Sequence, residues 1–211
     1  MSEYLTEEER LDALKQWWKE NARSVVLGIG FGAAMVIGWN VWQQKQLDTA
    51  RQASAVFQQL LKAEQEDKAD AALKLAERLK DGFGSTTYGV YGKLITAKLK
   101  AQAGDVATAK TLLQDVMTNT QDENFKHLAR LRLGQVMLAL QQQEEALKLI
   151  EAADTAASGA YQGLYAELKG DLLVALKRTD QARTAYERAR QLGQSSAVLE
   201  LKLQDLGPTD S

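Results

Sequence analysis

Cysteine is absent from this chain, and proline and histidine each occur once, at Pro208 and His127. Without cysteine there is no disulfide, no thiolate nucleophile and no cysteine-ligated zinc. A single histidine leaves no histidine cluster for a metal and weakens any Ser-His-Asp arrangement. The 26 basic and 28 acidic side chains nearly cancel, so the bulk charge gives no attraction for nucleic acid. We therefore expect no enzyme activity, catalytic residues, cofactor, metal site or nucleic-acid partner.

What is present favours helices. The 211 residues have room for one folded domain and an appendage, and 45% of them are hydrophobic, enough for a sizeable core. Alanine, leucine, glutamine, lysine and glutamate dominate, and these are good helix formers. The composition predicts an all-α fold.

The longest uncharged stretch runs from Ser24 to Trp42. A helix of that length covers about 28 Å, close to the hydrocarbon thickness of a bilayer. Trp18 and Trp39 are separated by about 31 Å along such a helix, which suits the two aromatic belts of a membrane. A buried helix of a soluble domain rarely runs so far without a charge, and no small-residue cleavage site follows, as a signal peptide requires. We expect a single N-terminal transmembrane helix over residues 24–42.

Basic residues are unevenly placed around this span. Four precede it and two follow it within a comparable window: Arg10, Lys15, Lys19 and Arg23, then Lys45 and Arg51. Such an excess marks the cytoplasmic side. We expect residues 1–23 in the cytoplasm and residues 43–211 on the other side of the membrane. The alternative, in which residues 43–211 face the cytoplasm, requires that the charge rule fails for this protein.

Residues 6–20 have the pattern of a short helix. Thr6 and Glu9 form a capping box, while Trp17 and Trp18 favour a membrane interface. The alternatives are a helix on the membrane surface and a simple lead-in to the span.

Small residues recur at helical spacing inside the span. Such residues let a second helix approach closely in lipid, although glycine is also common in single spans for no such reason. The two sets are Gly28 with Gly32, and Gly30 with Ala34 and Gly38.

The rest of the chain contains an internal repeat. Residues 131–153 and 167–189 align without a gap, and weaker copies lie upstream. The anchoring alanines, Ala72, Ala109, Ala146 and Ala182, are 37, 37 and 36 residues apart. Small residues at fixed positions let the two helices of a hairpin pack closely, and each hairpin must stack on the next to bury its apolar face. We expect a tetratricopeptide-like solenoid of four helical hairpins over residues 43–211, with turns at residues 104–105, 141–143 and 177–180. A helix over residues 195–206 is expected to cap it and to end at Gly207-Pro208.

We number each hairpin so that its anchoring alanine is position 20, and we call this numbering the repeat frame. Positions 2, 5, 9 and 12 then lie on the first helix of each hairpin and line the concave face. One interpretation is that these residues form a groove for a partner peptide. The alternatives are that they belong to the core, or that the protein's own last helix covers them. The residues at these positions are Phe57, Leu61, Tyr91, Leu94, Lys98, Leu128, Leu131, Gln135, Leu138, Leu164, Glu167 and Asp171. His127 has no second metal ligand beside it and is expected to be a surface residue.

Several segments resemble one known family. They are the acidic lead, a span ending in IGWNVW, the run ARQASAVFQ at residues 50–58, TYG at residues 87–89 and the pattern DENxKxLAxLRL at residues 122–133. In this order they resemble the YfgM-type ancillary subunits of the SecYEG translocon. The resemblance implies a protein anchored in the inner membrane with residues 43–211 in the periplasm. It also implies association with SecYEG and with the periplasmic chaperone PpiD, and a part in handing exported client proteins to chaperones. It brings no catalytic or binding residues with it. A repeat adaptor of another envelope machine, for cytochrome maturation or cell division, is the alternative.

Overall fold

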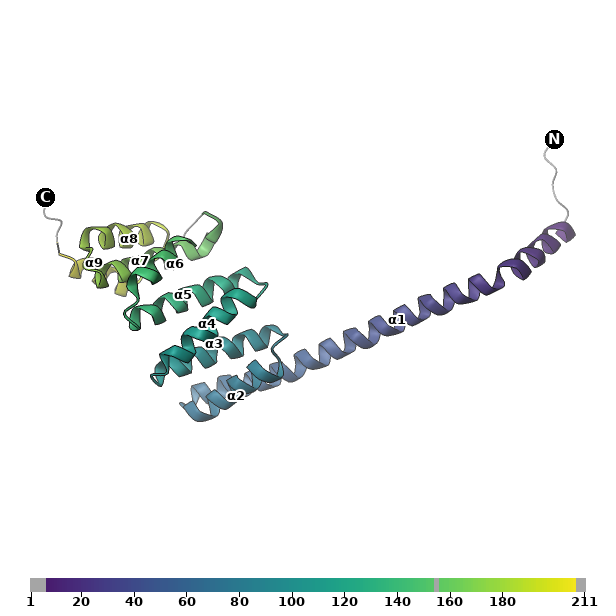
Figure 1. Cartoon of the computed structure of the whole chain (residues 1–211), viewed down its shortest axis with the longest axis horizontal. Coiled ribbons are helices and arrows are strands. Elements are labelled where there is room, and N and C mark those ends of the chain that lie inside the picture. Colours follow the sequence, from purple (N-terminus) through teal and green to yellow (C-terminus); the bar gives the residue numbers. More distant parts are fainter. Residues whose placement is uncertain (1–6, 154–155, 208–211) are drawn as a thin grey trace, which may run out of the picture. The chain divides into compact units, whose positions relative to one another are not determined.

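A computed structural model describes residues 7–153 and 156–207, and these residues are almost entirely helical (Figure 1). The chain divides into two compact units, residues 1–51 and residues 52–211. The helices are α1 (Glu7–Gln65), α2 (Ala69–Gly82), α3 (Thr87–Gln102), α4 (Val106–Asn119), α5 (Glu123–Ala139), α6 (Gln143–Glu151), the 3-10 helix η1 (Ala156–Tyr161), α7 (Gln162–Ala175), α8 (Thr179–Gln191) and α9 (Ala197–Asp205).

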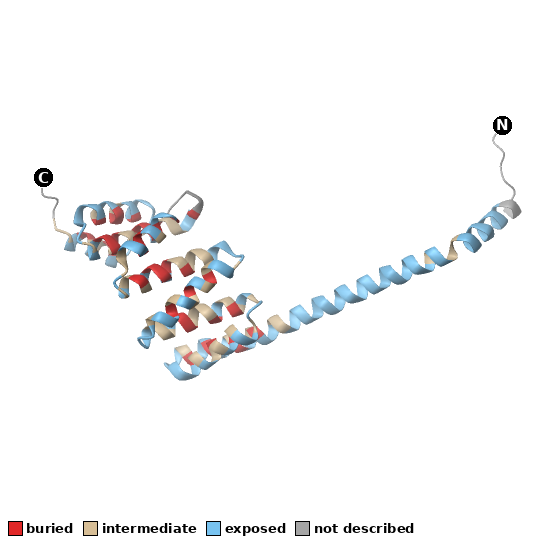
Figure 2. Ribbon diagram, viewed as in Figure 1, coloured by how far each residue is buried: buried red, intermediate tan, exposed pale blue. Residues whose placement is uncertain are grey.

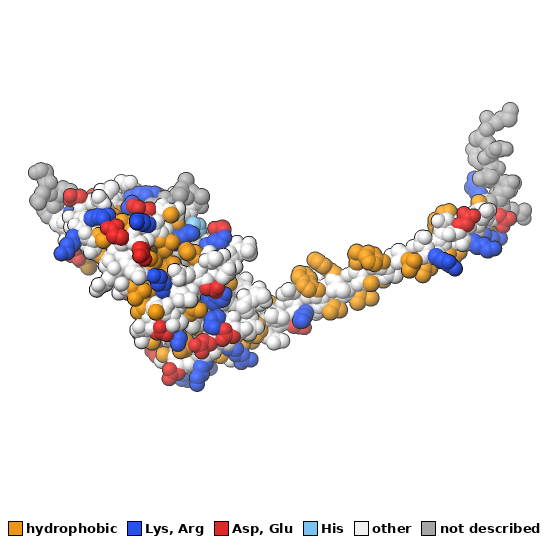
Figure 3. Space-filling view, viewed as in Figure 1, with side chains coloured by type: hydrophobic (Ala, Val, Ile, Leu, Met, Phe, Trp, Pro, Cys, Tyr) orange, Lys and Arg blue, Asp and Glu red, His pale blue; other side chains and the backbone are white. Residues whose placement is uncertain are grey.

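Helix α1 contains the uncharged stretch of residues 24–42. Its large apolar side chains are solvent-exposed, with 73% of Leu27 and 63% of Trp39 accessible, and apolar atoms surround the helix (Figures 2 and 3). By length and composition α1 is able to cross a membrane. The helix begins at Glu7 and continues through the span without a break, so residues 7–20 are a lead-in and not a separate element. Thr6, the first residue of the expected capping box, lies outside the described residues.

The second unit confirms the array of hairpins. The C-terminal part of α1 pairs with α2, and the pairs α3–α4, α5–α6 and α7–α8 follow, with α9 packed at the end of the stack (Figure 1). All four anchoring alanines are buried: Ala72 is 1% exposed, and Ala109, Ala146 and Ala182 are completely covered. The expected final helix is present two residues shorter at its start, because the Ser196 side chain accepts a hydrogen bond from Leu199 N–H and caps it there.

Each hairpin turns through one residue in the left-handed conformation. These residues are Asp67 (φ 52°), Gly104 (φ 84°), Gln141 (φ 58°) and Lys177 (φ 59°), with the same spacing as the anchoring alanines. The N–H of the following residue donates back to a carbonyl of the preceding helix, as in Lys68 to Ala63 and Gln142 to Met137, both at 2.9 Å. The expected turns are confirmed, although α6 and α8 begin at Gln143 and Thr179, inside the expected loops. Three of the four left-handed residues are not glycine, so a search of the sequence for glycine does not find these turns.

The apolar interior of the hairpins falls into three clusters. One lies within the first hairpin around Leu60 and Leu79, the largest spans the second to fourth hairpins, and the third joins Tyr186 to Leu199 of α9. The buried residues of the second unit are spread over its paired helices (Figure 2). Each hairpin therefore depends on its neighbours for part of its core.

Two glycines of the repeat, Gly134 and Gly170, make room for large side chains. A Cβ added at Gly170 would lie 2.2 Å from Cε1 of Tyr186. One added at Gly134 would lie 3.1 Å from Cδ1 of Ile150 and 2.9 Å from Cδ2 of Leu168 in the next hairpin. Tyr186 and Ile150 each stand four residues after the anchoring alanine of their hairpin, so each glycine accommodates the large side chain at this position.

Thr96 of α3 carries a buried hydroxyl without a hydrogen-bond partner among the described residues. Thr96→Val keeps the shape and removes the unpaired oxygen, so we expect the free energy of unfolding to rise by about 1 kcal/mol. Urea unfolding followed by circular dichroism measures this. Thr111→Val is the matched control, since the Thr111 hydroxyl donates to Ala107 O at 3.1 Å on the surface. An equal or lower stability of Thr96→Val would contradict the expectation.

Candidate functional site

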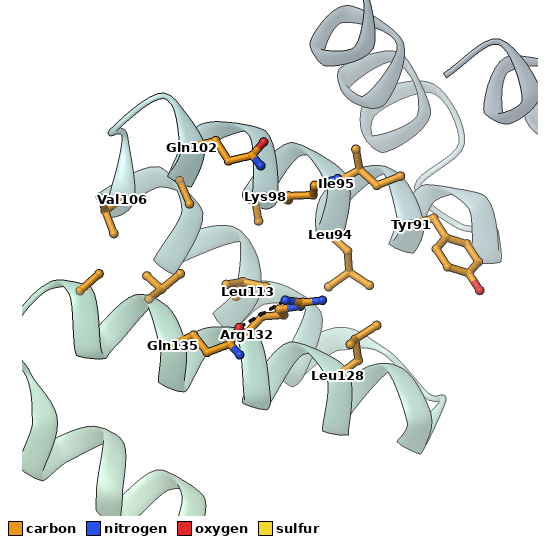
Figure 4. Close-up of a pocket in the computed structure, with 14 residues that line it drawn as sticks. Tyr91, Leu94, Ile95, Lys98, Gln102, Val106, Leu113, Leu128, Arg132 and Gln135 are labelled. Atoms are coloured by element: carbon orange, nitrogen blue, oxygen red, sulfur yellow. Dashed lines mark hydrogen bonds between the residues drawn. The ribbon is translucent and has the colours of Figure 1, made fainter. Parts of the chain in front are cut away.

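A cavity of the hairpin array lies between α3 and α5. Its volume is about 440 Å³, and Leu113 of α4 forms part of its floor (Figure 4). The residues that line it are Tyr91, Leu94, Ile95, Ala97, Lys98, Ala101, Gln102, Val106, Leu113, Leu128, Arg132, Gln135, Val136 and Ala139. Most of this surface is aliphatic, with Lys98, Arg132 and two glutamine amides at its rim.

A second, smaller hollow of about 230 Å³ continues the same face between α5 and α7. It shares Leu128, Arg132 and Gln135 with the first, so the two form one groove along the first helices of the second to fourth hairpins. Lys202 of α9 lines its far end.

The groove contains most of the residues expected on the concave face. Tyr91, Leu94, Lys98, Leu128 and Gln135 line the larger cavity. The smaller hollow adds Leu131, Leu164, Glu167 and Asp171. Three expected residues line neither hollow: Phe57, Leu61 and Leu138. Leu138 is packed against the main core, as the alternative interpretation of these leucines expects.

Two kinds of groove residue were missed by the repeat frame. Ile95, Arg132 and Leu168 all stand one position after the expected position 5, which makes position 6 a lining position in three successive hairpins. This position lies between positions 2 and 9 at helical spacing, so the pattern was present in the sequence. Lys202 is the second kind, because it comes from the capping helix, outside the repeat.

Aromatic rings continue the groove face toward the first hairpin. Phe57 of α1 lies 5.3 Å from Tyr91, measured between ring centroids, and Tyr91 lies edge-on to Phe125 of α5 at 5.0 Å. Tyr91 is 37% exposed, so this row of rings leaves an accessible aromatic surface at the mouth of the larger cavity. Phe57 therefore supports the groove through Tyr91.

At the far end of the groove, a lysine of α9 forms ion pairs with two of the expected groove residues. Lys202 Nζ donates to Glu167 at 2.9 Å and to Asp171 at 3.0 Å, and the Tyr186 hydroxyl donates to the same Asp171 carboxylate at 2.8 Å. Burial opposes the charged form of Lys202, but these hydrogen bonds outweigh it and raise the Lys202 pKa. Burial and the hydrogen bond to Asp171 raise the pKa of Tyr186, which stays protonated. The protein's own last helix thus occupies this end, as one alternative expected.

His127 is half-buried and has partners that the sequence did not indicate. Its ring stacks on Tyr161 at 4.8 Å, and its Nδ1 shares a 2.7 Å hydrogen bond with the hydroxyl of the completely buried Tyr165. Burial and the nearby charge of Arg130 lower the His127 pKa, against a smaller opposing effect of Glu123. Sequence reasoning missed these contacts because Tyr161 and Tyr165 lie one hairpin further along the chain.

The lowered pKa of His127 predicts a dependence of stability on pH. Unfolded histidine titrates near its ordinary pKa of about 6.5, so below that pH the unfolded state binds the proton more readily and folding loses stability. Above it both states are neutral and the effect vanishes. We expect the stability advantage of the natural chain over His127→Gln to shrink as the pH falls from about 7.5 to about 5.5. Urea midpoints at several pH values measure it, and a constant difference would contradict it.

The small residues of the span have nothing against them in this structure. A Cβ added at Gly28, Gly30, Gly32 or Gly38 would meet no atom within 4 Å, and Ala34 is exposed. The two rows lie on different sides of α1, since Gly28 and Gly30 are half a helical turn apart. Their part in helix packing stays a prediction.

Known proteins match this chain over most of its length. The family model described as "Tetratricopeptide repeat-like domain" matches residues 15–208. The chain is 32% identical over 190 residues to the "Ancillary SecYEG translocon subunit" of Escherichia coli (strain K12), covering 89% of this chain and 88% of that protein. It is 29% identical over 208 residues to the protein of the same name from Haemophilus influenzae, covering 98% of this chain and all of that protein. The chain thus matches these relatives over most of their length, and it belongs to the family of ancillary SecYEG translocon subunits.

Proposed function

We propose that this protein is a single-span subunit of the inner membrane that associates with the SecYEG translocon through its span and its hairpins. The observation that carries the proposal is the presence, on one chain, of an exposed uncharged helix and a hairpin array with an open apolar groove. Relatives of nearly equal length are named as subunits of that translocon. No step of this function requires catalysis.

The proposed topology places residues 1–23 in the cytoplasm, residues 24–42 in the membrane and residues 43–211 in the periplasm. It is supported by the four basic residues before the span against two after it. Alkaline phosphatase fused after Ser211 is active only in the periplasm and tests this directly. An inactive fusion, with a fluorescent cytoplasmic reporter at the same position, would reverse the orientation.

Within this function, we propose that the groove receives segments of exported proteins or of a chaperone such as PpiD. The aliphatic floor around Leu94 and Leu128 and the exposed ring of Tyr91 suit apolar side chains of an extended or helical segment. The link to PpiD comes from the family resemblance. A photoreactive amino acid placed at Tyr91 should cross-link to such partners in living cells, whereas one placed at exposed Arg78 on α2 should not.

Co-purification from membranes in mild detergent tests the association itself. The tagged full chain is compared with a twin in which residues 24–42 are replaced by an uncharged leucine-alanine span of equal length, so both remain anchored. We expect translocon subunits with the natural chain and fewer with the twin. Recovery of a cytochrome-maturation or cell-division machine, and no translocon, would overturn the proposal in favour of the alternative.

The two rows of small residues give a finer version of this test. We propose that one row packs against a translocon helix, because small residues allow close approach in lipid. Gly28→Leu with Gly32→Leu fills one row, and Gly30→Leu with Gly38→Leu fills the other, so each pair is the control for its counterpart. Loss of translocon subunits with one pair identifies the packing face, and equal recovery with both excludes the rows as contacts.

A further inference from the structure

Three cations line the groove, Lys98, Arg132 and Lys202, and two of them are paired with carboxylates. Glu167 and Asp171 are both held by Lys202 at the α9 end. At the α3 end, Lys98 is paired with Glu64 of the first hairpin, with Nζ 2.9 Å from the carboxylate oxygen. Arg132 stands between these two pairs and lines both hollows.

Arg132 is the exception to this pairing. Its guanidinium donates to the Gln135 amide oxygen at 3.3 Å, and it has no carboxylate within 4 Å among residues 10–153 and 158–207. The other two cations that line the groove, Lys98 and Lys202, do have one. A guanidinium offers five donors in a planar fork that matches a carboxylate.

The surroundings of Arg132 are apolar. Figure 4 shows the guanidinium lying across the cavity, between Leu94 of α3 and Leu128 of α5 and above Leu113. A charge at the edge of an apolar surface interacts more strongly than one in open water, because the local dielectric constant is lower. The site thus combines a place for an apolar side chain with a donor for an adjacent anion.

We propose that the cavity between α3 and α5 binds a peptide segment in which a large apolar side chain is followed by a carboxylate, with the carboxylate on Arg132. This deepens the proposed function, since it states which chemistry a partner of the groove must carry. The apolar side chain enters beside Leu94, Leu128 and Leu113, and the acidic group pairs with the guanidinium. Gln102 and Gln135 at the rim offer amide groups to the peptide backbone.

The charges favour an acidic peptide over the other occupants. A basic segment in the larger cavity would meet Lys98 and Arg132, and no carboxylate is among the residues that line this cavity. A second copy of the hairpin domain brings no excess charge of either sign, since residues 43–211 carry 22 basic and 22 acidic side chains. A fatty acid has a carboxylate and a chain, but it makes no use of the two glutamine amides.

The experiment uses the full chain in nanodiscs, so that detergent does not fill the cavity. The probes are pairs of fluorescein-labelled synthetic peptides with leucine, phenylalanine or tryptophan followed by Asp-Glu in one member and Asn-Gln in the other. Fluorescence anisotropy measures Kd. We expect the acidic member of at least one pair to bind about tenfold more tightly at low salt, and this preference to fall as salt is raised.

Two substitutions locate the effect. Arg132→Gln removes the charge and leaves a shorter polar side chain, and it should reduce the preference to about twofold or less. Arg130→Gln is the matched control on the same helix, since Arg130 lines neither hollow, and it should keep the full preference. Both variants should unfold at the same urea concentration as the natural chain.

Each other outcome overturns the proposal. No binding of any pair, equal binding of acidic and amide members, or a preference that survives Arg132→Gln all remove Arg132 as the anion site. Binding of oleate at the cavity with no preference between peptides would identify a lipid site instead. Translocon recovery is measured separately, so its absence beside a clear acidic preference would refute the proposed assembly and leave the chemistry of the groove standing.

Discussion

Gly92→Ala should destabilise the hairpin array by about 3 kcal/mol, against a gain of about 1 kcal/mol that alanine usually brings inside a helix. A Cβ at this position of α3 would lie 2.7 Å from both Leu79 Cβ and Lys80 N and 2.8 Å from Ala76 O of α2. Two of these three atoms belong to the backbone and cannot rotate away. The helices α2 and α3 would have to separate, and no side-chain substitution nearby relieves the contact.

The first hairpin should respond to this change more than the rest. Its apolar cluster is separate from the cluster that joins the second to fourth hairpins, and stacked repeats unfold in units. Urea unfolding followed by circular dichroism should therefore show an early partial transition in Gly92→Ala. Gly82→Ala is the control, because a Cβ there meets no atom within 4 Å. Equal stability of the two variants would refute the close approach of α2 and α3.

Gly170→Ala should have an effect of similar size for a different reason. The added Cβ would lie 2.2 Å from the ring of Tyr186, which is 2% exposed and therefore has no free space to move into. Overpacking of this kind costs about 1 to 3 kcal/mol, and here the ring also holds a hydrogen bond to Asp171 that the shift would break. We expect a loss near the upper end of that range.

Unlike the contact at Gly92, this contact is with a side chain, so it should be reversible by a second substitution. Tyr186→Ile introduces the residue that the third hairpin carries at the same position, Ile150, opposite Gly134. We expect Gly170→Ala with Tyr186→Ile to be more stable than the sum of the two single changes by about 1 to 2 kcal/mol. Additive losses would show that the glycine is needed for something other than the space occupied by Tyr186.

Local spacing in the sequence was enough to predict the hairpins. Ala72, Ala109, Ala146 and Ala182 lie at a fixed interval, and their burial follows because each helix pair repeats the same contact. The uncharged stretch from Ser24 to Trp42 was equally clear, since the absence of charge over a bilayer's thickness needs no tertiary information. Both features depend only on neighbours along one helix or one hairpin.

The parts that could not be predicted depend on contacts between hairpins. The buried environment of His127 is made by Tyr161 and Tyr165 of the following hairpin, and a lone histidine in the sequence gives no sign of them. The pairing of Glu167 and Asp171 is made by Lys202, which belongs to no repeat. Arg132 stands one position after an expected lining position. The repeat frame gives positions along one helix, whereas the offset between neighbouring helices decides which further positions face the groove.

The contacts of α9 also determine when the fold is finished during synthesis. The chain is made from its N-terminus, so Lys202 and Leu199 emerge after all four hairpins are complete in sequence. Until then Glu167 and Asp171 lie side by side without their cation, and Tyr186 and Ala166 lack the cover that Leu199 and Leu203 provide. A chain without α9 therefore presents an acidic, partly open end to its surroundings, and arrival of α9 makes this end less acidic and closes it. Chaperones and proteases that recognise exposed apolar surface could distinguish the two forms at this single end of the molecule.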